Sequence, residues 1–335
     1  MEQIWISCIA LSYNGGDKIL QTLESFKNQS YQYKDLVVAD DASTDDGYTV
    51  SIIENWISNN HHYFQGVQFI KNPQNLGIVK NMRNASLHAK GDIVFGLGQG
   101  DLCYDNKSFN ILSNEINKQR NNGINDPYFW LCEYDAFQIK NTEQVIVKLN
   151  KDLPHQHLLI ANNPIKALKV NLRRWEIGGI AMIYNKKFYK KEIYPLFEAP
   201  KNWEDGPSFL WALAGEKKIG IIPYKLRLYE IGTGISWQSS KSKNNDIRSS
   251  FTKIGAIMLN KKRTMPVFLE EYLNWINTLS PQDKQIRKIL DTYINMIRKT
   301  YGLESTLSNT KYFYIKLLDK INIVLRYFYI IIAKK

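Results

Sequence analysis

Four short stretches of the sequence combine acids, hydroxyls, amides and glycines at positions where a strand is expected to end or a loop to turn. They are Leu11-Ser12-Tyr13-Asn14, Ala39-Asp40-Asp41-Ala42-Ser43-Thr44-Asp45, Gly98-Gln99-Gly100-Asp101 and Trp203-Glu204-Asp205. Carboxylates can hold a divalent metal as hard oxygen ligands or remove a proton as a general base. Glycines let the backbone approach a ligand closely. Together these residue types indicate one site that binds a ligand and moves a proton.

The elements that must position these residues alternate along the first 135 residues. Apolar runs of strand length are separated by segments whose apolar residues recur with helical period. The predicted strands are 4–11, 36–39, 66–70, 92–97 and 128–133, and the predicted helices are 18–29, 48–59, 78–89 and 107–120. This alternation predicts an α/β fold with a mostly parallel sheet and helices on both faces. Ligands bind beyond the carboxyl ends of the strands in such sheets, which is where three of the four stretches fall.

The rest of the chain is less regular. Strands are predicted at 144–149, 177–184 and 218–222, and helices at 207–214, 268–279, 285–299 and 312–332. The polar stretch 241–245 is a predicted boundary. We therefore expect one domain over 1–245, with a first half at 1–135 and a second at 136–245, followed by a basic helical C-terminal extension over 246–335.

Composition limits the classes of protein that fit. The chain has 335 residues, of which 44% are hydrophobic and 23% charged, so a collagen, a coiled coil and a wholly disordered chain are excluded. The cysteines Cys8, Cys103 and Cys132 have no metal-ligand spacing, and their odd number argues against a disulfide framework. Surface positions are expected for the histidines, including His61 and His62, because they lie mostly in polar stretches.

Charge is concentrated at the C-terminal end. The whole chain carries 44 − 32 = +12, and residues 251–335 carry 15 − 6 = +9, which leaves +3 for the first 250 residues. This distribution argues against a nucleic-acid-binding protein built around a basic groove, and indicates a local basic surface that could face anionic lipid. A steep salt dependence of DNA or RNA binding would favour the nucleic-acid alternative.

Neither a signal peptide nor a membrane span is expected. The predicted strand 4–11 begins almost at Met1 without a basic segment before it, and the apolar run from Tyr327 to Ala333 is far shorter than the roughly 20 residues that cross a bilayer. We expect a cytoplasmic protein, with peripheral contact at the inner face of the cytoplasmic membrane as an option.

Over roughly residues 3–240 the sequence resembles the family 2 glycosyltransferases, which are inverting enzymes with the GT-A fold. Several family motifs occur in the family's order and spacing. The matching segments are Ser12-Tyr13-Asn14, 20–29 (LQTLESFKNQ), 39–45 (ADDASTD), 75–81 (NLGIVKN), 89–92 (AKGD) and Glu204-Asp205. One such motif alone is weak, but several in order are specific.

The resemblance implies an inverting transfer of a sugar from a nucleotide-sugar, most simply a UDP-sugar, to a hydroxyl. It places Asp41 on the uracil edge and Asp205 as the base, with Glu204 as its neighbour or substitute. The residues that it implies around the donor are Leu11, Ser12, Tyr13, Asn14, Asp41, Asn75, Gly77, Asn81, Gly100 and Asp101. The acceptor is expected to be a saccharide or a lipid-linked saccharide in bacterial cell-surface polysaccharide synthesis, such as O-antigen or capsule.

One motif departs from the family. Its metal motif is Asp-x-Asp or Asp-x-Asp-Asp, whereas this chain has Gly98-Gln99-Gly100-Asp101, in which only the last acid remains. By resemblance, Asp101 holds Mg²⁺ or Mn²⁺ at the diphosphate, where the metal would neutralise the charge of the leaving group. The lost acids leave metal dependence open. They also motivate the alternative of a nucleotide-sugar-binding protein without catalysis.

Other interpretations of the same residues remain. The acids of 40–45 could cap a helix N-terminus, and Glu204-Asp205 could be a solvated surface pair. A Gly-rich dinucleotide turn is a poor interpretation of 96–100, because the next residues do not open a helix. The predicted helix 312–332 has a narrow polar stripe, so it either packs on the catalytic body or lies on an anionic membrane surface.

Overall fold

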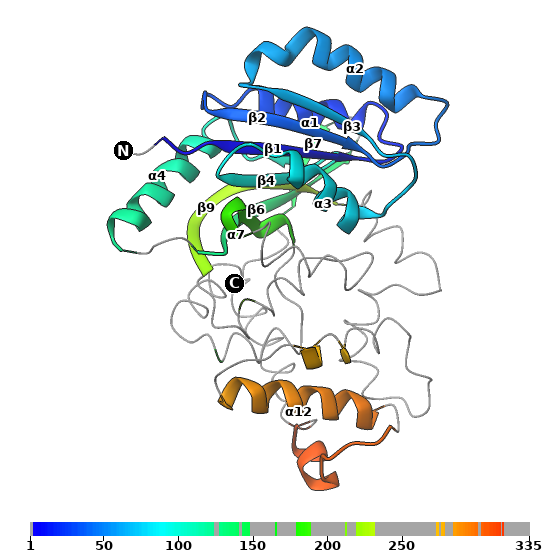
Figure 1. Cartoon of the computed structure of the whole chain (residues 1–335), viewed down its shortest axis with the longest axis vertical. Helices are drawn as coiled ribbons and strands as arrows, with labels where there is room; N and C mark the ends of the chain where they lie inside the picture. Colours follow the sequence, from blue (N-terminus) through cyan, green and yellow to red (C-terminus); the bar gives the residue numbers. More distant parts are fainter. Residues whose placement is uncertain are drawn as a thin grey trace. The chain divides into compact units, whose positions relative to one another are not determined.

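The computed structural model forms two compact units, each described here by itself (Figure 1). The first contains 1–168 and 177–238, and the second contains 169–176 and 239–335. The described residues of the first unit are 3–123, 127–140, 143–147, 165, 179–188, 212 and 219–231. Those of the second unit are 273–274, 276–278, 284–300, 303–315 and 317.

Four parallel strands form the first part of the sheet, as the sequence predicts. They are β1 (Ile6–Ser12), β2 (Lys34–Asp40), β3 (Val67–Lys71) and β4 (Ile93–Gly98), in the order β3-β2-β1-β4. β1 and β2 are buried along almost their whole length, which explains why they are continuously apolar rather than alternating. The register pairs Ser12 with Asp40 and Leu11 with Gly98, so these strands end at one edge.

The predicted helices cover both faces of these strands. They are α1 (Lys18–Lys27), α2 (Tyr48–Asn60), α3 (Ile78–His88) and α4 (Ser108–Asn121), with a short 3-10 turn η1 (His61–Tyr63) after α2. On one face, Phe26 of α1 and Phe109 of α4 both contact Phe95, with ring centroids 6.3 and 5.0 Å away. The next residue of β4, Gly96, points to the other face, where a Cβ would meet the Met82 side chain of α3 at 2.7 Å. Helices therefore lie on both faces, as predicted.

The remaining strands extend the sheet with mixed pairing. They are β5 (Leu102–Cys103), β6 (Phe129–Lys140), β7 (Glu143–Val147), β8 (Met182–Asn185) and β9 (Ile219–Glu230). β8 joins β4 to β6 in antiparallel pairs, and β9 lies parallel to β6. β5 was not predicted, and β6 and β9 are both longer than the apolar runs that predicted them. Within the predicted strand 177–184, residues 179–181 instead form a 3-10 turn, η2 (Gly179–Ala181), while 177–178 lie outside the described residues.

The pairing of β5 with β9 matters for the site. Leu102 pairs with Leu228 and Cys103 with Arg227 in antiparallel register. Because β5 directly follows the 98–101 turn, this register brings the end of β9, at Glu230, back to that turn. The predicted helix 207–214 lies outside the described residues, except for Ala212, which is helical and buried.

The second unit contains the amphipathic helix α12 (Lys284–Thr300), which confirms the helix predicted at 285–299. Its buried residues include Leu290, Ile294 and Ile297, at helical spacing. Residues 273–274 and 276–278 are helical within the predicted helix 268–279. Of the predicted helix 312–332, only 312–315 and 317 are described, and they are helical; the rest lies outside the described residues. Among described helices, none combines the length and the apolar character needed to cross a membrane.

Candidate active site

The carboxyl ends of β1, β2 and β4 bring three of the four predicted stretches together. Gln99 joins the first stretch to the third. Its Oε1 accepts hydrogen bonds from the Tyr13 backbone N–H at 2.8 Å and from Ser12 Oγ at 3.2 Å, and its Nε2 donates to the Tyr13 carbonyl at 3.0 Å. The Gln99 side-chain amide thus forms with the Tyr13 backbone the same pair of N–H···O bonds that the backbone of an adjacent β-strand would form. Ser12 Oγ is engaged here, whereas the Tyr13 ring, in a residue that is 40% exposed, faces solvent.

Asn14 joins the first stretch to the second. Its backbone N–H donates to Ser43 Oγ at 2.8 Å, and its Oδ1 accepts from the Thr44 backbone N–H at 2.7 Å. Its φ of 49° is left-handed, a conformation that asparagine adopts more readily than most residues. Asn14 therefore positions the loop that follows β2.

Helix capping is part of the role of the 40–45 acids. Asp40 accepts a hydrogen bond from the Ser43 backbone N–H at 2.9 Å, which closes a tight turn after β2. Asp45 Oδ2 accepts from the Thr49 backbone N–H at 3.2 Å in the first turn of α2. The capping interpretation therefore holds for Asp45, while Asp41 points elsewhere.

Asp41 organises the loop between β3 and α3. It is 4% exposed, and its Oδ1 accepts from Asn72 Nδ2 and from the Leu76 backbone N–H, both at 2.9 Å. Its Oδ2 accepts from the Gly77 backbone N–H at 2.9 Å. Since a carboxylate oxygen can accept two hydrogen bonds, Oδ2 keeps one acceptor position besides this bond.

The other three predicted residues of this loop lie in the same network. Asn75 Oδ1 accepts from the Gly77 backbone N–H at 3.1 Å. Asn81 of α3 donates to the Ala39 carbonyl at 3.2 Å and accepts from Asn72 at 2.9 Å. Gly77 has a φ of 80°, which glycine adopts without strain. The structure thus brings Asp41, Asn75, Gly77 and Asn81 together, and shows that they hold one another in place.

The 98–101 turn is tied to α1 by Thr22. Thr22 Oγ1 accepts from the Gly100 backbone N–H at 3.0 Å and donates to the Asp101 carbonyl at 2.8 Å. Gly100 has a φ of +92°, so this turn also requires a glycine. The backbone of the reduced metal motif is therefore held by the first helix.

Asp101 has a strongly perturbed carboxyl group. Its Oδ1 accepts from the Glu230 backbone N–H at 3.0 Å. Burial raises the pKa of Asp101 from 3.8 to about 7, although this hydrogen bond and the nearby Arg227 both oppose the rise. The charge of the Glu230 side chain raises it further. A carboxyl with a pKa near neutrality is typical of functional sites, although buried structural networks also produce one.

Sequence reasoning missed Glu230. This residue is 5% exposed, and its carboxylate accepts two hydrogen bonds from Lys18 Nζ, at 2.9 and 3.1 Å. A Cβ on Gly100 would lie 2.1 Å from Glu230 Oε2, so this carboxylate fills the space that a side chain at 100 would enter. The sequence predicts that this strand ends at 222, so no pattern in the sequence marked Glu230, which is the last residue of β9.

The two carboxylates fit a divalent metal. Mg²⁺ is commonly held by one or two protein carboxylates together with substrate phosphates and water. Asp101 and Glu230 supply two neighbouring carboxylates at the edge where a diphosphate would lie. In the described part of the chain, no group of three or more His, Cys, Asp or Glu side chains could hold a metal. Phosphate oxygens would therefore have to complete such a site.

Asp205 and Glu204, predicted as the base and its neighbour, lie outside the described residues. Leu11 is the residue before the end of β1, paired with Gly98. The prediction that Asp41, Asp101 and Asp205 share one cavity therefore stays a prediction.

Comparison with known proteins supports the fold and the family. Residues 7–158 match the family model described as Glycosyl transferase family 2. EpsE of Bacillus subtilis (strain 168), a protein named as a glycosyltransferase, is 29% identical over 99 residues, which are 30% of this chain. The match spans about a third of that relative, 34% of its length.

Solved structures are similar over most of the chain. TarS of S. aureus, residues 1–349, has a TM-score of 0.54 at 16% identity, over 89% of this chain and 87% of that one. Its complex with UDP-GlcNAc has the same TM-score and identity, over 89% and 88%. The mannosyltransferase PcManGT from Pyrobaculum calidifontis, in complex with GDP-Man and Mn²⁺, has a TM-score of 0.54 at 14% identity, over 90% and 73%. At these identities the likeness shows the fold alone.

Proposed function

Because residues 7–158 match the Glycosyl transferase family 2 model and the fold is similar to that of a solved mannosyltransferase, we propose that the chain transfers a sugar from a nucleotide-sugar to a hydroxyl group with inversion at the anomeric carbon. One observation carries the proposal. Predicted donor residues from three separate stretches meet at the carboxyl edge of β1, β2 and β4, in a continuous network of hydrogen bonds. This edge is where ligands bind in open α/β sheets.

The donor is proposed to be a UDP-sugar. The remaining acceptor position on Asp41 Oδ2 could receive an N–H from a base edge, and the exposed Tyr13 ring could lie against the base. TarS has been solved with UDP and with UDP-GlcNAc, and PcManGT with GDP-Man, so the fold accepts more than one nucleotide. A thermal-shift screen of UDP-, GDP- and TDP-sugars would identify the donor.

At the diphosphate we propose that Asp101 and Glu230 hold a divalent metal, with Glu230 in place of the acids that residues 98 and 100 lack. A bound metal would neutralise charge on the leaving diphosphate. Lys18, whose side chain is 38% exposed, pairs with Glu230 and adds a second positive charge at this edge. Glu230 would have to turn from Lys18 toward the metal, or share its two oxygens between them.

This role for Glu230 can be tested without measuring transfer. Titration of Mn²⁺ into the full chain with UDP present, followed by the paramagnetic resonance of free Mn²⁺, measures metal affinity directly. Glu230→Gln should weaken Mn²⁺ binding at least tenfold. Glu54→Gln removes an exposed, ion-paired carboxylate on α2 that is not part of the proposed metal site, and it should leave the Mn²⁺ affinity unchanged. Equal Mn²⁺ affinity in the two variants would remove Glu230 from the metal site.

The base is proposed to be Asp205, with Glu204 as its neighbour or substitute. An inverting displacement needs one carboxylate to take the proton of the acceptor hydroxyl, and such help contributes about 10²- to 10⁴-fold. This assignment rests on the Glu204-Asp205 pair in the sequence.

We further propose that the acceptor is a saccharide or lipid-linked saccharide in bacterial cell-surface polysaccharide synthesis, such as O-antigen or capsule. The +9 charge of residues 251–335 supports peripheral contact with the anionic inner face of the cytoplasmic membrane, where a lipid-linked acceptor would lie (15 − 6 = +9).

The decisive experiment measures nucleotide release and sugar transfer by the full chain with the donor found in the screen. Asp205→Asn and Asp101→Ala should each reduce transfer at least a hundredfold, while Glu54→Gln should leave it unchanged. Wild-type transfer in both Asp variants would refute the assigned roles. If calorimetry shows nucleotide-sugar binding but no acceptor yields product, the chain is instead a binding protein without catalysis.

A further inference from the structure

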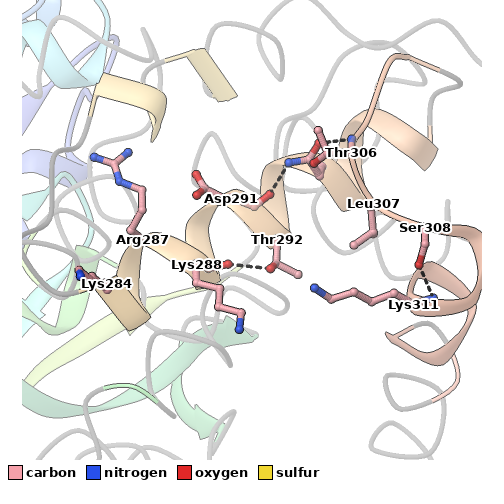
Figure 2. A pocket seen from close by; sticks show the side chains of 10 residues that line it. Lys284, Arg287, Lys288, Asp291, Thr292, Thr306, Leu307, Ser308 and Lys311 are labelled. Atoms are coloured by element: carbon pink, nitrogen blue, oxygen red, sulfur yellow. Dashed lines mark hydrogen bonds between the residues drawn. The ribbon is translucent and has the colours of Figure 1, made fainter.

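The second unit contains a pocket that sugar transfer does not explain. Its volume is about 450 Å³, and it lies between one side of α12 and the segment 306–311 (Figure 2). The residues that line it are Lys284, Arg287, Lys288, Asp291, Thr292, Asn295, Thr306, Leu307, Ser308 and Lys311. They contain four basic side chains and one acid, a net charge of 4 − 1 = +3.

The pocket is built by the sequence of α12 and by the return of the chain beside it. Lys284, Lys288, Asp291 and Asn295 recur at helical spacing, so they share one side of the helix. The returning segment is held there by Asn295, whose Oδ1 accepts from the Thr306 backbone N–H at 2.9 Å and whose carbonyl accepts from Ser305 Oγ at 2.8 Å. These bonds define the second wall of the pocket.

The basic side chains outnumber the acid that could compensate them. Among the described residues, no salt bridge involves Lys284, Arg287, Lys288 or Lys311. Figure 2 shows Lys311 extending from its own segment toward the side of α12 that carries Lys288. Positively charged side chains that line one pocket without a paired acid repel one another, and an anion bound among them would offset that repulsion.

One hydroxyl group complements the positive charge. Ser308 Oγ on the returning segment accepts from the Lys311 backbone N–H at 3.3 Å, so its own proton can be donated to an anion. Thr292 Oγ1 also lines the pocket, but it donates its proton to the Lys288 carbonyl at 2.6 Å. Lysine and arginine with nearby hydroxyls are the donors that bind phosphate oxygens. A volume of about 450 Å³ is within the range of small-ligand sites and larger than one phosphate needs.

We propose that this pocket binds a phosphate ester, with the phosphate between Lys288 and Lys311 and the rest of the ligand along Lys284 and Arg287. The ester could belong to a soluble phosphorylated metabolite or to the headgroup of an anionic lipid, and the chemistry of recognition is the same for both. The proposal does not depend on the sugar-transfer activity, since it concerns residues of the second unit only.

The test uses the full chain and two double variants with equal loss of charge. Lys288→Gln/Lys311→Gln changes the pocket, and Lys107→Gln/Lys118→Gln removes two exposed positive charges at α4 in the first unit. Calorimetry with glycerol 3-phosphate examines the soluble source, and flotation with phosphatidylglycerol vesicles, against phosphatidylcholine vesicles, examines the lipid source.

We expect the pocket variant to weaken binding at least tenfold in one of the two arms, and the control variant to change it less than twofold. The arm that responds identifies the source. If neither probe binds the unchanged chain, or if both variants weaken binding equally, the pocket is not a phosphate site. Should the pocket variant fail to fold, Lys311→Gln alone still removes one of the two charges proposed to hold the phosphate, and unchanged binding in that variant would also overturn the proposal.

Discussion

Replacing Asp101 by asparagine should reveal the energetic cost of its buried carboxylate. Burial raises the pKa of Asp101 from 3.8 to about 7 in the folded chain. Between these two values the folded state keeps a proton that the unfolded state releases. The free energy of unfolding of the unchanged chain therefore falls as pH rises from about 4 to 7, and this contribution is constant above that window. An asparagine side chain at this position has the same shape, can accept the Glu230 N–H and does not titrate.

The magnitude follows from the difference in pKa. The difference is 7 − 3.8 = 3.2, and each pKa unit corresponds to about 1.4 kcal/mol. The full cost of the ionised carboxyl is therefore about 4 kcal/mol above pH 7. Because part of this cost is already present at pH 5, the change between pH 5 and pH 8 is roughly 2 to 3 kcal/mol.

Urea unfolding of both proteins at pH 5, 6, 7 and 8, in buffers that contain EDTA, measures this change. The Asp101→Asn variant should gain roughly 2 to 3 kcal/mol over the unchanged chain between pH 5 and pH 8, with little further gain at pH 9. All other titrating groups are common to the two proteins, so they cancel in the difference. A stability difference that does not vary with pH would show that the Asp101 carboxyl ionises normally, and the reasoning from burial would be wrong.

Three further changes probe the network around the site. Asp41→Asn replaces one acceptor oxygen by a donor, so residue 41 loses its hydrogen bond with the backbone N–H of Leu76 or of Gly77. The free energy of unfolding should fall by about 1 to 3 kcal/mol, and UDP should bind at least tenfold more weakly by calorimetry. Unchanged affinity would show that the 72–77 loop does not contribute to nucleotide binding. Gly100→Ala places a Cβ 2.1 Å from Glu230 Oε2 at a φ of +92°, so we expect a loss of about 1 to 3 kcal/mol in urea unfolding, and wild-type stability would contradict this geometry. Gln99→Leu removes the hydrogen bonds to Ser12 and Tyr13 and should lower the free energy of unfolding by about 2 to 4 kcal/mol in urea. Gln119→Leu, which removes a distant amide on α4, should leave UDP affinity unchanged and serves as the binding control for Asp41→Asn.

Local patterns were sufficient for the first half of the fold. Apart from β5, the strands and helices from β1 to α4 lie within a few residues of their predicted bounds, since burial on both faces makes parallel strands continuously apolar and one-sided burial gives helices a 3.6-residue period. The second half was harder. β9 continues from 219 to 230 through Pro223, Lys225 and Arg227, and polar residues in a strand hide its length from any pattern of apolar residues.

The same division applies to the site. The sequence by itself determined that Ser12, Tyr13, Asp41 and Asp101 lie at the carboxyl ends of predicted parallel strands, and the topology of such sheets then requires them to share an edge. It also carried the resemblance to the family 2 glycosyltransferases, through motifs that are local. Only the tertiary structure decided that Gln99 holds Tyr13, that Asp41 holds the 72–77 loop, and that Glu230 with Lys18 occupies the space beside Gly100. These contacts join residues 35 to 212 positions apart. These contacts depend on strand register and on burial, and burial also raises the pKa of Asp101. Neither the register nor the burial can be predicted from residues that are close together in the sequence.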